Sequence, residues 1–267
     1  DGLDQPTYKR YFNWVSDISQ GDLGYSRTYR IPVTEMMMPA LTATFILSIT
    51  SLIFSLVTAI PLGIACALKP NSKLDYAVNL FNFAGISVPS FWLGIVLIII
   101  FAVNLGWLPA GGYQTTGTVY TSFFAELLDK GKYLILPMVS LSIQTIGRFA
   151  RFTRSSMLEA LRNDFIRTAR AKGLSSQVVI WRHAFRNALI PLITIIAISI
   201  SSIFSGALIT ETLFAYPGVG RLIYSSIMGN DFNVAMVSFI ISVSMVLIMN
   251  LVADLLYGVV DPRISYK

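Results

Sequence analysis

The chain has 267 residues, of which 54% are apolar and 13% charged, with a net charge of +6 and a mean hydropathy of +0.66. A soluble domain carries about 25% charged residues, and here four long runs carry none: 36–68, 76–125, 187–210 and 232–253. Uncharged apolar runs of about 18 or more residues indicate membrane-spanning helices. The composition therefore excludes a soluble enzyme, a disordered chain and a coiled coil, and these runs lack the alternation of transmembrane barrel strands.

The predicted class is an all-α polytopic membrane protein. Apolar residues at a spacing of three to four predict an amphipathic helix over 8–18, within an N-terminal segment 1–35. The transmembrane domain is predicted over 36–260, with spans at about 40–68, 82–104, 133–154, 188–210 and 233–257. Pro89 is expected to kink the second span, with Ser87 and Ser90 near the carbonyls that the kink frees.

The distribution of Lys and Arg predicts the orientation, because cytoplasmic loops of membrane proteins are enriched in them. If the loop 69–75, the segment 148–186, Asp254 and the tail 261–267 share one side, that side has a net charge of +8 and the other −2. We therefore expect the +8 side in the cytoplasm and residues 1–35 outside. Because that segment contains no cleavable signal core, we also expect a sixth span before Asp1.

One cytoplasmic loop, 155–187, has the sequence pattern of two short helices rather than that of a simple connector. Good helix formers predict a helix over 155–172. Gly173, after Lys172, fits a left-handed helix end, and a second short helix carries an apolar stripe that includes Trp181. From these features alone the loop fits either a groove on another protein or the surface of anionic lipid.

Four motifs in this chain resemble those of one transporter family. They are GDLGYS at 21–26, RTARAKG at 167–173 followed by HAFRNA at 183–188, ETLFAYPGVGRL at 211–222, and DPRI at 261–264. The chain resembles the permease subunits of ABC importers, in the dipeptide, oligopeptide and nickel transport class. The family's general loop signature begins with Glu-Ala-Ala, whereas this chain has Arg167, Thr168 and Ala169 there and keeps the glycine at Gly173. This departure is typical of the peptide importers.

The resemblance implies a type I ABC importer permease fold, in the inner (cytoplasmic) membrane. It implies a subunit that forms half of a pathway for peptides. Its partners would be a second, non-identical permease, two cytoplasmic ATPase subunits, an extracytoplasmic substrate-binding protein and the lipid bilayer. It also implies that the loop couples transport to ATP hydrolysis through eight residues: Arg167, Thr168, Ala169, Arg170, Ala171, Lys172, Gly173 and Leu174.

No catalytic, cofactor or metal site is expected within the chain itself. The sequence has no phosphate-binding loop of the G-x-x-x-x-G-K-[ST] type, so ATP and Mg would be bound by the partner ATPases. The single Cys66 and the single His183 exclude a disulfide or metal framework. The positive charge is explained by the cytoplasmic loops, and no nucleic acid is expected as a partner.

The outer loop 211–231 contains Pro217, Gly218 and Gly220, which predict irregular backbone that must be solvated or covered by protein. It is interpreted either as a cap near the pathway or as an ordinary loop. Polar residues within the predicted spans are candidates for lining the substrate pathway, although serines also pack between membrane helices. They are Asn82, Ser87, Ser90, Gln144, Ser199, Ser202 and Ser205.

Two other classes of function would make different demands on the chain. A self-sufficient secondary transporter or channel for a small solute would move its substrate without an ATPase. A membrane-embedded enzyme would need catalytic pairs within the spans, and charged residues there are scarce.

Overall fold

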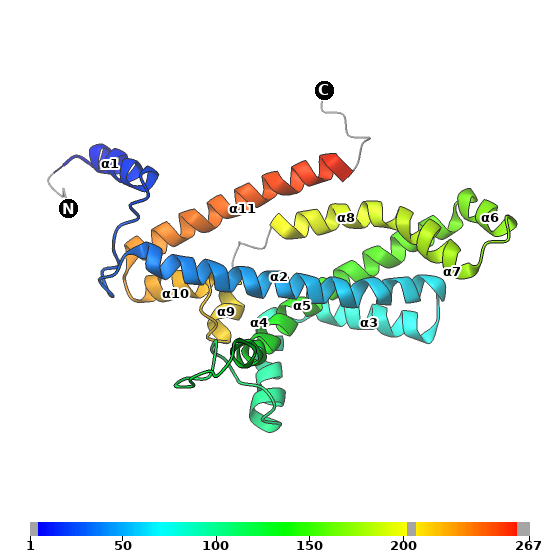
Figure 1. The fold of residues 1–267 in the computed structure, drawn as a ribbon, viewed down its shortest axis with the longest axis horizontal. Helices are drawn as coiled ribbons and strands as arrows, with labels where there is room; N and C mark the ends of the chain where they lie inside the picture. The colour runs from blue at the N-terminus through cyan, green and yellow to red at the C-terminus, as the bar shows by residue number, and fades with distance from the viewer. Residues whose placement is uncertain (1–4, 202–206, 261–267) are drawn as a thin grey trace.

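The structure is a computed structural model that describes residues 5–201 and 207–260, and over these residues it is helical (Figure 1). The elements are α1 (Thr7–Ser19), α2 (Val33–Leu68), α3 (Lys73–Ser87), α4 (Ser90–Leu97), η1 (Ile98–Asn104), α5 (Phe123–Arg162), α6 (Asp164–Ala171), α7 (Ser176–Val178), η2 (Val179–Phe185), α8 (Arg186–Ser201), α9 (Leu208–Leu213), α10 (Val219–Met228) and α11 (Phe232–Val260). The two η elements are π-helical turns.

The two longest helices, α2 and α5, form the central pair of the bundle. Small buried residues recur at every fourth position of α2, which lets the two backbones approach closely; they are Ser51, Ser55, Ala59, Gly63 and Ala67. A Cβ atom added to Gly63 would lie 2.6 Å from the Cβ of Thr153 and 2.7 Å from the Ala150 carbonyl oxygen. Ser142 also donates a hydrogen bond from α5 to the carbonyl oxygen of Ser51, at 3.1 Å.

Four helical stretches are long and apolar enough to cross a membrane: 33–68, 123–162, 176–200 and 232–255. A fifth candidate is a bent pair, because 73–85 and 90–104 meet at an angle of 105°. The bend falls at Pro89, where a kink was predicted, because α3 ends at Ser87 and α4 begins at Ser90. Two side chains of α5 satisfy carbonyl oxygens at the break, since Gln144 donates to Val88 (2.9 Å) and Ser140 donates to Ser90 (3.2 Å).

The predicted fourth span, 188–210, also has different bounds. Helical structure begins already at Ser176, passes through η2 without interruption, and continues in α8 to Ser201. Residues 208–213 form the separate short helix α9. The second short helix that the sequence predicted in the loop is thus the start of the membrane-crossing stretch. Ser202 and Ser205 lie outside the described residues.

The N-terminal segment confirms the predicted amphipathic helix, α1, which projects from the bundle in Figure 1. The following loop is attached to the start of α11. Ser26 donates a hydrogen bond to buried Asp231, Thr28 donates its backbone N–H to the same carboxylate at 3.2 Å, and Asn233 donates to the carbonyl oxygen of Tyr25 at 3.0 Å. Burial raises the pKa of Asp231, but these hydrogen bonds outweigh it, so its pKa is lower than usual.

Candidate functional site

The segment 164–174 is a short helix with a defined stop at each end. At Asn163 the backbone turns extended (φ −72°, ψ 153°), which separates α6 from α5. At the other end Gly173 has φ +74°, its N–H donates to Arg170 (2.9 Å), and the Leu174 N–H donates to Ala169 (3.3 Å). This pair of bonds is a Schellman motif, and its left-handed residue favours glycine.

One face of the 164–174 segment is anchored to the bundle. Ile166 and Ala169 are 1% and 4% exposed, and they belong to an apolar cluster with Met157 of α5, Ile64 of α2 and Ala184 of η2. Burial of these side chains on three different elements fixes the segment relative to the long helices.

The opposite face of the segment is exposed and cationic. It consists of Arg167, Thr168, Arg170, Ala171, Lys172, Gly173 and Leu174. Arg167 has a 3.3 Å ion pair with Asp164, but both side chains are more than 80% exposed, so the pair is strongly screened by solvent. Seven of the eight residues predicted from the sequence thus share one surface, whereas Ala169 points into the bundle.

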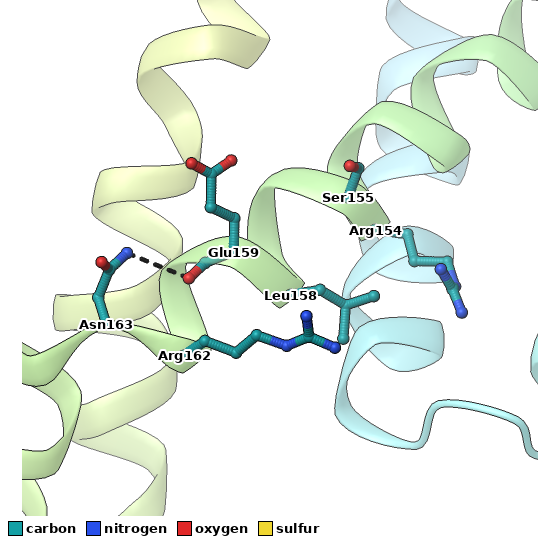
Figure 2. Close-up of a pocket in the computed structure, with 6 residues that line it drawn as sticks. All are labelled: Arg154, Ser155, Leu158, Glu159, Arg162 and Asn163. Carbon is teal, nitrogen blue, oxygen red and sulfur yellow. Dashed lines mark hydrogen bonds between the residues drawn. The ribbon is translucent and has the colours of Figure 1, made fainter.

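The structure corrects one local prediction for this loop. The helix predicted over 155–172 is interrupted at Asn163, whose side chain donates a hydrogen bond to the Glu159 carbonyl oxygen at 3.1 Å (Figure 2). On η2 it is Val179 and Ala184 that are buried, while Trp181 remains 55% exposed.

A polar hollow of about 420 Å³ lies beside the end of α5 (Figure 2). Its lining residues are Arg154, Ser155, Leu158, Glu159, Arg162 and Asn163. The hollow is thus built from the last three turns before the 164–174 segment.

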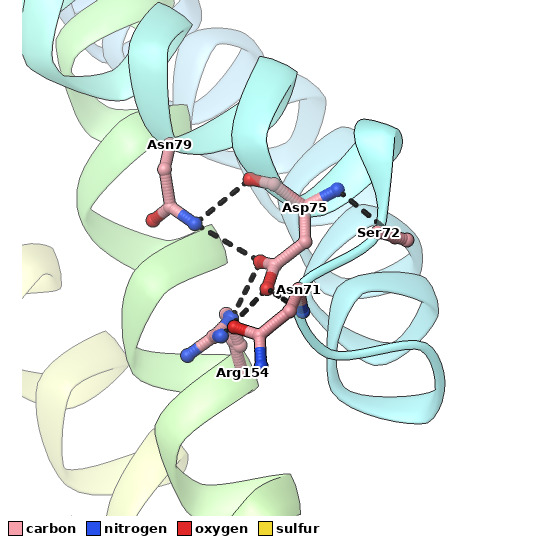
Figure 3. Close-up of polar contacts among 5 residues, drawn as sticks. All are labelled: Asn71, Ser72, Asp75, Asn79 and Arg154. Atoms are coloured by element: carbon pink, nitrogen blue, oxygen red, sulfur yellow. Dashed lines mark hydrogen bonds and ion pairs between the residues drawn. The ribbon is translucent and has the colours of Figure 1, made fainter.

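An ion pair that the sequence did not reveal ties this end of α5 to the first turn of α3 (Figure 3). Asp75 is 2% exposed, and the Arg154 guanidinium contacts it with two bonds of 2.6 and 2.7 Å. The Asn71 backbone N–H (2.9 Å) and the Asn79 amide (2.9 Å) complete the set of donors. A bidentate pair with its remaining lone pairs satisfied is the geometry in which a buried pair is stable.

The predicted pathway residues are distributed over three parts of the bundle. Asn82 of α3 is buried, with its side-chain oxygen against Gly147 and without a hydrogen-bond partner among the described residues. Ser87 and Ser199 each donate to a carbonyl oxygen one turn earlier in their own helices. As described above, the Gln144 side chain and the Ser90 carbonyl oxygen take part in hydrogen bonds at the break between α3 and α4.

The segment 207–221 is organised around one buried carboxylate, Glu211, which the sequence analysis did not single out. Its side chain is fully buried and accepts hydrogen bonds from the Thr44 hydroxyl (2.8 Å) and from the Arg221 backbone N–H (3.2 Å). Gly218 leaves the room that this carboxylate occupies. The glycines Gly218 and Gly220, which follow a proline, indicated an irregular backbone in the sequence. They did not indicate that this backbone packs against the Glu211 side chain.

Taken together, the described residues form a helical bundle with several apolar helices long enough to cross a membrane, and a short helical segment, 164–174, is exposed on one side at one end of the bundle. The family model described as "Binding-protein-dependent transport system inner membrane component" matches residues 59–266. The chain belongs to this family, and it is a multi-pass inner-membrane component of an ABC transport system.

Curated relatives are similar over nearly the whole chain. The oligopeptide transport system permease protein AppB of Bacillus subtilis is 41% identical over 99% of this chain and 83% of its own length. The dipeptide transport system permease protein DppB of Escherichia coli K12 is 36% identical, covering the whole chain and 83% of the relative. These matches support the permease interpretation over a self-sufficient carrier or channel.

A solved structure has the same fold. The inward-facing MetNI methionine ABC transporter matches with a TM-score of 0.64, covering 85% of this chain and 96% of that chain. At 18% sequence identity the similarity concerns the fold alone.

Proposed function

We propose that this chain is one of two permease subunits of an ATP-driven peptide importer, and that its 164–174 segment couples transport to ATP hydrolysis. The relatives of highest identity named above are permeases for oligopeptides and dipeptides, which supports peptides as the cargo. The proposed partners are a second permease, two cytoplasmic ATPases that bind ATP and Mg, and an extracytoplasmic binding protein. The chain itself contributes no catalytic residue.

The observation that carries the proposal is the two-faced construction of the 164–174 segment. A coupling element has to be stiff, because a flexible one would absorb the movement of the ATPases. Its buried face meets α2, α5 and η2, and its exposed face offers Arg170 and Lys172 for oriented docking. When the ATPases close on ATP, we expect the segment to move as a body and to rotate the long helices.

The orientation follows from the same proposal. The segment and the 69–75 loop face the cytoplasm, and the 105–122 and 207–231 segments face outside. In this arrangement Glu211 and the neighbouring Gly218 and Gly220 lie at the outer end of the bundle. Protein there covers backbone N–H and C=O groups that could not find hydrogen-bond partners in lipid.

The test is peptide uptake by the complete importer in proteoliposomes. Ala171→Arg adds a bulky side chain to the exposed face without disturbing the buried anchor, and it is expected to abolish ATP-dependent uptake while membrane insertion persists. Ala110→Arg, another exposed alanine but in the 105–122 loop, is the matched control and is expected to retain uptake. Uptake by the wild type without ATPases, or full uptake by Ala171→Arg, would contradict the proposal.

A further inference from the structure

The side of α5 that faces away from α2 carries a continuous polar stripe. Its members follow at intervals of three or four residues and therefore lie on one helix face; they are Gln144, Arg148, Arg151, Ser155 and Glu159. All of them except the half-buried Gln144 are exposed. The buried face of the same helix is formed instead by residues such as Ile146, Ala150, Thr153 and Met157.

The first arginine of this stripe lies at a depth where charge is costly. Arg148 is 16 residues after Lys132, which corresponds to about 24 Å along the helix axis. The hydrocarbon core of a bilayer is about 30 Å thick. If Lys132 lies at the outer boundary, Arg148 lies inside the hydrocarbon layer and Arg151 lies close to the inner boundary. Arginines at such depth face protein or a water-filled path.

Within 5–201 and 207–260, neither Arg148 nor Arg151 has an acidic partner, and the ion pairs found there involve other cations. Arg154, less than one turn further along α5, shows the contrast, because it is neutralised by two bonds to Asp75. The stripe therefore offers two uncompensated guanidinium groups on adjacent turns. Its far end opens into the hollow of Figure 2, where Ser155 and Glu159 are lining residues.

Two neighbouring guanidinium groups that lack a partner are suited to a carboxylate. Arginine binds carboxylates through two parallel hydrogen bonds, which a single ammonium group cannot imitate. The proposed cargo varies in its side chains, but every unmodified peptide ends in a carboxylate. An exposed, hydrated pair of cations would hold that group weakly, as a conduction path requires.

We propose that Arg148 and Arg151 form a carboxylate-binding station in the inner half of the translocation pathway, which receives the C-terminus of the peptide in transit. This inference rests on the proposed function, because it takes the peptide as cargo. It adds a ligand site and the chemical group that the site recognises. It also assigns the polar face of α5 to the water-filled path.

The experiment uses the complete importer in lipid nanodiscs without nucleotide, with Cys66→Ala and one cysteine introduced at Ser155. A membrane-impermeant thiol reagent should label this cysteine, whereas a cysteine at Val57, which is 67% exposed on α2 and expected to face lipid, should stay unlabelled. Millimolar alanyl-alanine should slow labelling at Ser155→Cys, and alanyl-alanine amide, which lacks the carboxylate, should not.

Substitution of the two arginines then tests the station itself. In Arg148→Gln/Arg151→Gln the dipeptide should lose its protective effect by at least about tenfold in concentration, the range of a lost hydrogen bond to a charged group. Arg148→Lys/Arg151→Lys should restore part of the protection by the dipeptide. Arg167→Gln, on the exposed face of α6, should leave that protection unchanged. Absence of labelling at Ser155→Cys would overturn the proposal, because protein or lipid would then cover the stripe. Equal protection by acid and amide, or protection that persists in the glutamine pair, would also overturn it.

The outcome is separable from that of the proposed function. ATP-dependent uptake is measured separately, with the same purified wild-type complex in proteoliposomes, and its ATP requirement tests the proposed function whether or not the station exists. If uptake requires ATP but the protection pattern fails, the station is wrong and the importer stands. If uptake proceeds without ATPases, the proposed function is wrong.

Discussion

A single methyl group at Gly218 should destabilise the 207–221 segment strongly. The backbone itself would accept alanine, since φ is −89° at this residue. The side chain of alanine would instead clash sterically, because an added Cβ would lie 2.5 Å from Oε1 of Glu211 and closer still to the rest of its carboxyl group. Favourable contacts between such atoms begin at about 3.5 Å, and hydrogen bonds from Thr44 and Arg221 hold the carboxylate in place.

The expected cost of Gly218→Ala is about 2–4 kcal/mol in the free energy of unfolding. Overpacking of a filled site costs about 1–3 kcal/mol, and weakening one hydrogen bond to a buried charge adds about 1 kcal/mol. The control is Gly131→Ala, the same chemical change inside α5 with nothing within 4 Å of the added atom. It should be neutral or stabilising by up to about 1 kcal/mol.

The assay is equilibrium unfolding of the purified chain in detergent, followed by tryptophan fluorescence and combined in a double-mutant cycle. Glu211→Ala alone should also destabilise, because it leaves the Thr44 hydroxyl and the Arg221 N–H without their acceptor. In Gly218→Ala/Glu211→Ala the new methyl group fits the space of the lost carboxylate, so the double variant should be at least about 1 kcal/mol more stable than additivity gives. Additive costs, or a Gly218→Ala variant as stable as the parent, would refute this reasoning.

Three further changes test other parts of the account. Arg154→Ala leaves the buried Asp75 carboxylate unpaired and should lower the free energy of unfolding by about 3 kcal/mol or more. The control Arg167→Ala breaks an exposed pair and should lower it by less than about 1 kcal/mol. Equal losses in the two variants would contradict the structure. In Gly173→Ala the added methyl group meets no neighbouring atom, but the residue must adopt φ +74°. The variant should therefore lose about 1 kcal/mol in the free energy of unfolding and transport less peptide per ATP hydrolysed. Gly173→Asn should lose less. The pKa of Asp231 is lowered in the folded chain, so its stabilising effect is complete above its unfolded pKa of about 3.9 and disappears as pH falls through the lower folded value; a melting temperature whose acid dependence is unchanged in Asp231→Asn would exclude this contribution.

The spans and the end of the 164–174 segment were predictable because their causes are local. Long uncharged runs identify the membrane helices from composition alone. Gly173 follows good helix formers and a lysine, and its φ of +74° confirms the predicted left-handed helix end. The break at Asn163 was not predicted, although Asn163 and Asp164 both have low helix propensity and Asn is favoured at the start of a helix.

The remaining features depend on contacts between residues that are distant in the chain. Asp75 and Arg154 are 79 residues apart, and Thr44 and Glu211 are 167 apart. A single sequence shows that each residue is polar but not which partner it has. The inward orientation of Ala169 has the same origin, because it follows from the packing of α6 against three other elements.

Cross-linking within the assembled importer tests the central claim most directly. A photo-reactive side chain at Ala171, on the exposed face of the 164–174 segment, is expected to form a covalent adduct with an ATPase subunit, and the same group at Ala110 is not. The adduct pattern should change when ATP is bound, because the segment is proposed to move with the ATPases. An importer that transports peptide while Ala171 forms adducts only with lipid or solvent would contradict the account.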